Sequence, residues 1–159
     1  MDTRNLLKQE LLFELTVADV LCTDVVTVSP DQHMGDLHAL LRDHQFSGAP
    51  VVEQGRLVGV ISIEDLIRWL NAGGADASIR DHMTPSPECL QPEMLLVHAI
   101  EHFEKSGYGR YPVADARDQR LLGILTKGLV IEGMLQRLAK ELQDEEIRRY
   151  RASHFFQDI

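Results

Sequence analysis

Two short stretches of this 159-residue chain place a hydroxyl group where it could bind a ligand. In each stretch the hydroxyl stands three residues after a glycine, as Ser62 after Gly59 and Thr126 after Gly123. An apolar run typical of a strand precedes each hydroxyl, and helical spacing follows it. A hydroxyl at the start of a helix lies beside free backbone N–H groups and the positive end of the helix dipole, which suits a phosphate group.

The two stretches differ three residues after the hydroxyl, where the first has Asp65 and the second has Leu129. A carboxylate one turn into a helix can accept the two hydrogen bonds of a sugar diol, whereas a leucine offers no acceptor. A simpler role is open for each polar residue. Ser62 and Thr126 are good helix N-caps, and Asp65 would complement the helix dipole without any ligand.

Both stretches belong to a longer internal repeat, which is the first feature to seek in a sequence. Three landmarks recur, with separations of 62 residues for two proline pairs and 64 for a glycine pair: Pro30 and Pro92, Pro50 and Pro112, Gly59 and Gly123. Each copy is about 60 residues long, and two copies that cannot each close a core should pack on each other.

Each copy has the pattern strand, helix, strand, strand, helix. In the first copy these elements are expected at residues 25–28, 31–45, 49–52, 56–61 and 63–70. Asp31 is the expected N-cap of the first helix, and Gln54-Gly55 is the expected hairpin turn. The second copy repeats the order at residues 89–90, 93–105, 111–114, 121–125 and from 127 onward.

The repeated motifs resemble a pair of CBS domains. The first copy carries Ser29-Pro30 and the segments 47–51 and 59–65; the second carries Met83-Thr84-Pro85, Gln91-Pro92 and the segments 109–113 and 123–126. The resemblance covers about residues 17–135. It implies an α+β fold of two tandem β-α-β-β-α units, packed as a pseudo-two-fold pair with flanking N- and C-terminal helices.

The resulting division of the chain has four parts. We expect an N-terminal amphipathic helix at 1–16, CBS unit 1 at 17–72, CBS unit 2 at 77–136 and a C-terminal helical extension at 137–159.

CBS pairs usually bind adenosine-containing ligands in clefts between their two units, so the resemblance implies two sites. The main site would contain Ser62, Asp65, Thr84, Pro85, Tyr108, Gly109, Arg110, Tyr111 and Pro112. The second, weaker site would contain Cys22, Thr23, Phe46, Ser47, Gly48, Pro50 and Thr126. Arg110 would reach a phosphate and the tyrosines would form an apolar wall, unless Arg110 is solvated and the tyrosines are core residues. Because Leu129 replaces the acid, we expect one competent nucleoside site and one that is weak, altered or purely structural.

The implied function is a non-enzymatic regulatory module. AMP, ADP, ATP or S-adenosylmethionine would be its regulatory ligand, with no required cofactor. It would form a homodimer through its CBS helices and pass its state through the terminal helices to an effector domain or protein. Two alternatives are a constitutive dimerisation scaffold without a nucleotide and the regulatory part of a larger enzyme or signalling protein.

Composition excludes several other classes. A net charge of −9 opposes broad binding to nucleic acids or anionic lipids. No apolar run reaches 18 residues, the N-terminus has no cleavage-site pattern, and Cys22 and Cys89 have no metal or disulfide spacing. We therefore expect a cytoplasmic protein without membrane spans. No catalytic constellation stands out, and His98 and His102 fit a solvated helix face better than a metal site.

The two ends carry apolar stripes. Residues 4–15 form an amphipathic pattern, expected to pack on the module or on a second copy. Toward the C-terminus a short heptad seam consists of Ile131, Leu135, Leu138 and Leu142. This seam predicts a connector to an output domain or a dimer stalk, and the alternative is a tail packed back on its own module.

Overall fold

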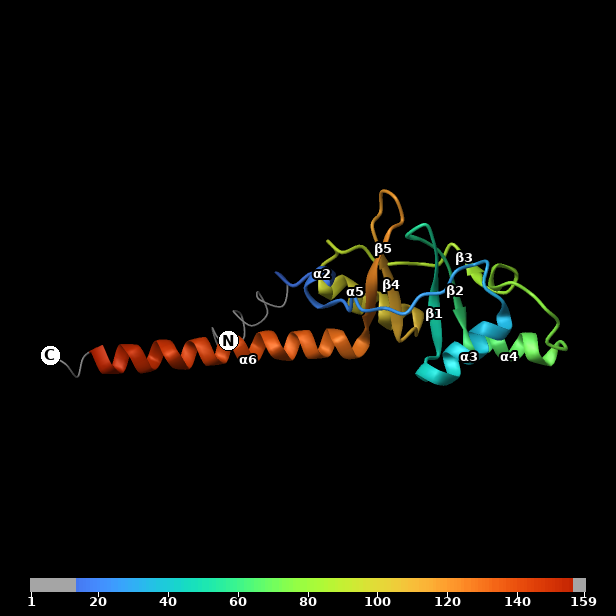
Figure 1. The fold of residues 1–159 in the computed structure, drawn as a ribbon. Coiled ribbons are helices and arrows are strands. Elements are labelled where there is room, and N and C mark those ends of the chain that lie inside the picture. Colours follow the sequence, from blue (N-terminus) through green and yellow to red (C-terminus); the bar gives the residue numbers. More distant parts are fainter. Residues whose placement is uncertain (1–13, 156–159) are drawn as a thin grey trace. The chain divides into compact units, whose positions relative to one another are not determined.

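The computed structural model describes residues 14–155, so most of the helix expected at 1–16 lies outside the described residues (Figure 1). The elements, in chain order, are α2 (Val17–Val20), α3 (Met34–His44), β1 (Gly48–Glu53), β2 (Arg56–Ser62), α4 (Ile63–Asn71), the 3₁₀ helix η1 (Ile79–Asp81), β3 (Thr84–Pro85), α5 (Leu96–Ser106), β4 (Arg110–Ala114), β5 (Leu121–Thr126) and α6 (Lys127–Phe155).

Two antiparallel sheets underlie the fold. The first has the order β1-β2-β3, and the second consists of β4 and β5. The β1–β2 turn confirms the predicted hairpin, because Gln54 and Gly55 both have positive φ angles, of 51° and 80°. This register places Gly48 opposite Ser62. The short strand β3 then pairs with β2, with Thr84 opposite Val60.

The first strand of each repeat is much shorter than expected. Of residues 25–28, only Val28 pairs, through a single parallel bridge to Val51. Leu90 likewise forms one parallel bridge, to Val113. The expected helix at 93–105 begins at Leu96. Each copy therefore keeps the predicted order of elements, but its first strand is reduced to one pair of residues.

The prediction that Asp31 caps the first helix is wrong. The helix α3 begins at Met34, and His33 is its N-cap. Residues 29–32 form a turn instead, closed by the hydrogen bond from Gln32 N to Ser29 O at 3.2 Å. The carboxylate of Asp31 accepts from Arg80 Nη2 at 3.4 Å, which holds it away from the helix start.

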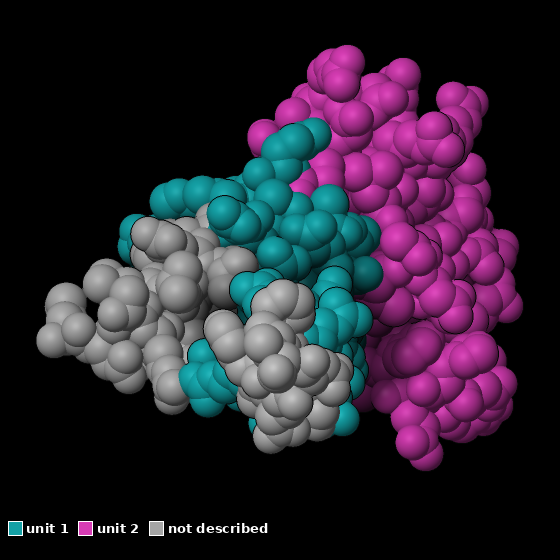
Figure 2. Space-filling model, turned by 90° about the vertical axis from the view of Figure 1, so that its left-hand side faces the viewer, with its two compact units in different colours: residues 1–21, 93–110, 125–159 teal, residues 22–92, 111–124 magenta. Residues whose placement is uncertain are grey.

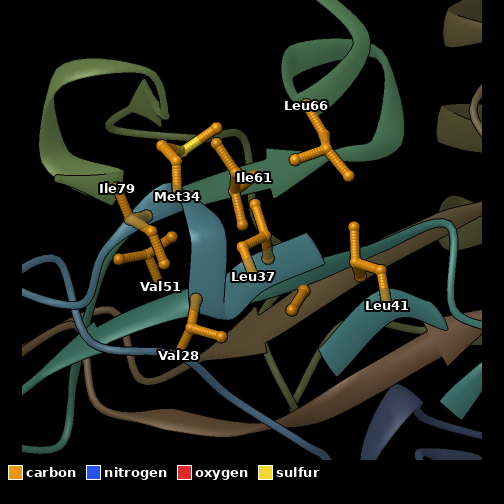
Figure 3. Packing of buried hydrophobic residues seen from close by; sticks show 9 residues of the cluster. Val28, Met34, Leu37, Leu41, Val51, Ile61, Leu66 and Ile79 are labelled. Atoms are coloured by element: carbon orange, nitrogen blue, oxygen red, sulfur yellow. The ribbon is translucent and has the colours of Figure 1, made fainter. Parts of the chain in front are cut away.

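A compact apolar core lies between α3, α4 and the β1–β2 hairpin (Figure 3). Helix α3 contributes Met34, Leu37 and Leu41. The hairpin, α4 and the neighbouring segments contribute the rest of the core: Val28, Ala49, Val51, Ile61, Leu66 and Ile79. Spacings of three and four residues along α3 bring its apolar side chains to one face. Burial of each large aliphatic side chain stabilises the fold by about 1.5–3 kcal/mol.

The chain divides into two compact units that do not follow the sequence repeats (Figure 2). Unit 1 comprises residues 1–21, 93–110 and 125–159, and unit 2 comprises residues 22–92 and 111–124. In unit 1, α2 and α5 both contact α6. Strands β4 and β5 contribute residues to both units.

The longest helix, α6, has 29 residues and belongs to unit 1. It continues from the end of β5 through the region expected as a separate extension, without a break (Figure 1). Three residues of the predicted heptad seam are strongly exposed on it: Ile131, Leu135 and Leu142. Within residues 14–155, no helix combines the length and the hydrophobicity needed to cross a bilayer.

Candidate functional site

Ser62 ends β2 and caps α4, as the sequence predicts. Its Oγ accepts a hydrogen bond from Asp65 N at 3.3 Å and donates one to Asp65 Oδ2 at 2.9 Å. The same carboxylate oxygen accepts from Ser62 N at 2.8 Å. These bonds form a reciprocal capping box, which orders the first turn of the helix.

Asp65 is the one charged side chain that is buried among residues 14–152, with 8% of its surface exposed. Its second oxygen, Oδ1, accepts from Arg68 Nη1 at 3.3 Å. An ionised carboxylate has about four acceptor positions, so the capping box and Arg68 leave little capacity unused. A ligand diol at this carboxylate would compete with Arg68, whose side chain is 75% exposed and free to move.

Thr84 and Pro85 form the strand β3, which pairs with β2 just before β2 ends at Ser62. Thr84 pairs with Val60, two residues before Ser62, and Pro85 pairs with Gly59. The repeated glycine has a structural reason here, because a Cβ at Gly59 would lie 2.6 Å from Met83 Sδ and 2.9 Å from Thr84 O. Only a glycine lets the segment that carries Thr84 approach β2 this closely.

The remaining residues of the predicted main site fall into both units. Tyr111 and Pro112 belong to unit 2, where Tyr111 is 1% exposed, the position expected of a core residue. Tyr108, Gly109 and Arg110 belong to unit 1. Tyr108 is 59% exposed there. The approach of these three residues to Ser62 stays a prediction.

The predicted second site is also divided between the units. Thr126 lies in unit 1 and caps α6, where its Oγ1 accepts from Leu129 N at 3.1 Å. Leu129 returns no hydrogen bond, so the reciprocal box of the first copy is absent from the second. The other six residues lie in unit 2. Cys22 exchanges two backbone hydrogen bonds of 2.9 Å with Ile124, which repeats the pairing of Thr84 with Val60.

Two residues expected at the second site lie close to Ser62. Gly48 is its partner across the hairpin, and Ser47 O accepts from Ile63 N at 2.8 Å. A Cβ at Gly48 would lie 2.7 Å from Ile61 O, which explains the glycine. Phe46 stacks on His44, with ring centroids 5.4 Å apart.

One residue of the predicted second site, Thr23, lines a cavity of about 290 Å³ in unit 2. Thr27, Arg120 and Gly123 line the same cavity. Arg120 was visible in the sequence as the repeat equivalent of Arg56, because the two arginines have the same separation of 64 residues as Gly59 and Gly123. The only sequence signal for Thr27 is its place in the same short run as Thr23.

A larger cavity of about 460 Å³ lies in unit 1 between α2 and α6. Asp19, Glu132 and Arg137 contribute charged groups to its wall. Asp19 also accepts from Thr16 N at 2.8 Å and from Thr16 Oγ1 at 3.1 Å. The spacing of Thr16 and Asp19 repeats that of Ser62 and Asp65, which is a signal visible in the sequence.

No group of three or more potential metal ligands occurs among the side chains that the structure describes. Of the two cysteines, Cys89 is half-buried beside Gln119, with Sγ 4.0 Å from its Oε1. Burial raises the pKa of the Cys89 thiol, and the charge of Glu88 raises it further.

Comparison with known proteins places the chain in a family. It matches the CBS domain over residues 17–72 and again over 79–136. The CBS domain-containing protein YhcV of Bacillus subtilis is 32% identical over 120 residues, 71% of this chain and 81% of YhcV. An inosine-5'-monophosphate dehydrogenase of Methanocaldococcus jannaschii is 30% identical over 109 residues, 68% of this chain and 21% of that enzyme.

Among solved structures, CBSX2 of Arabidopsis thaliana in complex with AMP is similar over 76% of this chain and 96% of its own. The two are 32% identical, with a TM-score of 0.67. The repeated motifs, the two matched segments and the shared fold agree with one another, and the chain therefore belongs to the CBS domain family as a tandem CBS pair.

Proposed function

We propose that this chain is a regulatory module that senses an adenosine-containing nucleotide. AMP, ADP, ATP or S-adenosylmethionine would bind at Ser62, Asp65 and Thr84, with the segment 108–112 completing the site. Two copies would associate through their CBS helices. The bound state would favour one arrangement of the terminal helices and so reach an effector domain or protein. A tenfold preference of the ligand for one arrangement supplies about 1.4 kcal/mol of bias.

One observation carries this proposal. A hydroxyl at a helix N-terminus, a buried carboxylate in the first turn and a second hydroxyl on the adjacent strand lie together in unit 2. The helix start suits a phosphate and the carboxylate suits a ribose diol. The 32% identity to CBSX2, crystallised with AMP, supports the same ligand class.

Titration calorimetry with AMP, ADP, ATP and S-adenosylmethionine tests the proposal. We expect binding of at least one of them to wild type, with a loss of about tenfold or more in Asp65→Asn, because hydrogen bonds to a charged acceptor are worth about 1.5–3 kcal/mol. The matched control is Asp19→Asn, because the Asp19 carboxylate accepts from the backbone N and the hydroxyl of Thr16 as the Asp65 carboxylate does from those of Ser62. Equal losses in both variants would assign the effect to general destabilisation.

A constitutive dimerisation scaffold is the second candidate. It is favoured by the Asp65 carboxylate, which already accepts hydrogen bonds within the protein. Asp65 already accepts from Ser62 and from Arg68, and Leu129 replaces the acid in the second copy. Absence of heat with all four nucleotides, together with stable self-association, would support this reading.

Membership in a larger enzyme is the third candidate. The similarity to inosine-5'-monophosphate dehydrogenase supports this candidate, because the matched segment spans only 21% of that enzyme. In that case the module would regulate a catalytic domain elsewhere. Coding sequence continuous with this chain would distinguish it from the first two candidates.

A further inference from the structure

The two β-hairpins of the chain are joined at their turns within unit 2. Leu57 N donates to Gln119 O at 2.8 Å, and Leu121 N donates to Gly55 O at 3.1 Å. These two bonds place Arg56 directly opposite Arg120 in an antiparallel bridge. Both hairpin turns therefore meet at the ends of their strands, away from the helix start at Ser62.

The geometry of this bridge brings two positive charges together. The hydrogen bonds flank the arginine pair and do not link its members, which is the pattern of a non-hydrogen-bonded pair with Cα atoms about 4.5 Å apart. Side chains of such a pair project to the same face of the sheet, and like charges directly opposite each other destabilise it. Arg56 and Arg120 are both exposed, so the cost is reduced by solvent but is not removed.

Arg56 and Arg120 lack the carboxylate partner that every other arginine of unit 2 has. Unit 2 contains six arginines and no lysine. Four of the arginines lie within 4.0 Å of a carboxylate: Arg42, Arg68, Arg80 and Arg117. Among the described residues, neither Arg56 nor Arg120 has such a partner.

The acidic residue nearest to Arg56 in the hairpin is engaged elsewhere. Glu53 pairs with Arg56 in the β1–β2 register. Its Oε1, however, accepts from Arg80 Nη2 at 2.9 Å. The remaining acid of the second turn, Asp118, accepts from the backbone N of Arg120 at 3.0 Å through Oδ1. The two arginines thus lie opposite each other without a carboxylate partner among the described residues, in a molecule whose net charge is −9.

The arginine pair adjoins the cavity of about 290 Å³, and Arg120 forms part of its wall. Thr23 and Thr27 line the same cavity. Guanidinium groups present several N–H donors in a plane, which match the oxygens of a phosphate, and hydroxyls add further donors. We propose that Arg56, Arg120 and the threonines of this cavity bind the phosphate groups of an anionic ligand. This site is independent of nucleotide binding at Ser62.

The test uses inorganic pyrophosphate as the probe, in titration calorimetry on the full chain at constant ionic strength. Wild type should bind it, and Arg56→Gln and Arg120→Gln should each bind about tenfold more weakly, because each removes one charge-assisted contact. The matched control is Arg117→Gln, which removes the same charge from the same turn but a side chain already paired with Asp115. That variant should keep wild-type affinity.

The proposal would be overturned by no binding of pyrophosphate at millimolar concentration, by an equal loss in Arg117→Gln, or by unchanged affinity in Arg56→Gln or Arg120→Gln. Misfolding is checked by the melting temperature without the probe, which should be equal or higher in Arg120→Gln because the repulsion is relieved. A lower melting temperature in Arg120→Gln would contradict the inference that Arg56 and Arg120 repel each other. Asp65→Ala should retain pyrophosphate binding, so this site and the nucleotide site can fail separately.

Discussion

At the scale of single residues, the two copies of the motif differ in how they hold their helices. Ser62 and Asp65 exchange hydrogen bonds in both directions, through the Ser62 backbone and hydroxyl and the Asp65 backbone and carboxylate. In the second copy the Thr126 hydroxyl accepts from Leu129 N, and Leu129 has no side-chain acceptor to return a bond. The acid of the first copy thus has a structural function in the protein, whatever ligand it also binds.

This difference predicts unequal costs for removing the two hydroxyls. We expect Ser62→Ala to lower the free energy of unfolding by about 1–2 kcal/mol and Thr126→Ala by about 0.5–1 kcal/mol, within the range of N-cap losses. Urea denaturation of both variants measures the two values side by side. A cost for Thr126→Ala equal to or above that for Ser62→Ala would show that the reciprocal box adds nothing.

The cysteines offer a prediction about reactivity. Burial raises the pKa of the Cys89 thiol, and the Glu88 carboxylate raises it further. A raised pKa leaves less thiolate at a given pH, so Cys89 should react with iodoacetamide at pH 8 more slowly than a cysteine in an unstructured peptide. Mass spectrometry of the peptide that contains Cys89 follows the rate. The reaction should accelerate in Glu88→Gln, and a rate equal to that of the free peptide would refute the assignment.

At the scale of elements, α2 depends on a glycine in α6. A Cβ added at Gly133 would overlap the side chain of Val20, so the two helices approach closely at this point. We expect Gly133→Ala to destabilise the chain by up to about 2 kcal/mol, because overpacking costs about 1–3 kcal/mol and the better helix propensity of alanine returns about 1 kcal/mol.

The companion variant Val20→Ala makes this prediction specific. In that background Gly133→Ala should be neutral or stabilising, because the overlapping methyl groups are gone and only the helix propensity remains. The double-mutant cycle is measured by urea denaturation. If Gly133→Ala stabilised the wild-type chain, the close approach of α2 and α6 would not exist in solution.

The order of the elements could be predicted from the sequence, because spacing along the chain determines it. The hairpin at Gln54-Gly55 and the cap at Ser62 depend on local residue types, and both predictions are confirmed. The strand at residues 25–28 was overestimated because β-branched residues favour extended backbone without supplying a partner strand. Its only pair is the bridge from Val28 to Val51, and no local pattern indicates such a long-range choice.

Part of the candidate site could also be predicted, because some of its residues are close together in the sequence. Ser62 and Asp65 lie in one motif, so their contact follows from helix geometry. Thr84 lies beside β2 because β3 pairs with β2. This close pairing is possible because residue 59 is a glycine. The separation of 64 residues between Arg56 and Arg120 equals that of Gly59 and Gly123, but a repeat spacing does not show that the two hairpin turns pair with each other.

At the scale of the whole molecule, the apolar surfaces on two helices need an explanation. Helix α4 exposes Ile63, Ile67 and Leu70, which are 43–50% accessible and spaced by four and three residues. Helix α6 exposes Ile131 and Leu135, at 58% and 61%. Spacings of three and four residues align each set on one face of its helix, and exposed apolar faces of this kind commonly form interfaces between subunits.

We therefore expect a homodimer that these faces hold together, and a single charge on either face should weaken it. Ile67→Glu and Leu135→Glu should each raise the dimer dissociation constant by about tenfold or more, because a buried unpaired carboxylate costs several kcal/mol. Sedimentation velocity at several concentrations measures the shift from dimer to monomer. The control is Gln136→Glu, which adds the same charge to α6 next to the seam and should leave the dimer intact. A wild-type chain that sediments as a monomer at every concentration would exclude the dimer, and dissociation by the control would assign the effect to net charge and not to the apolar faces.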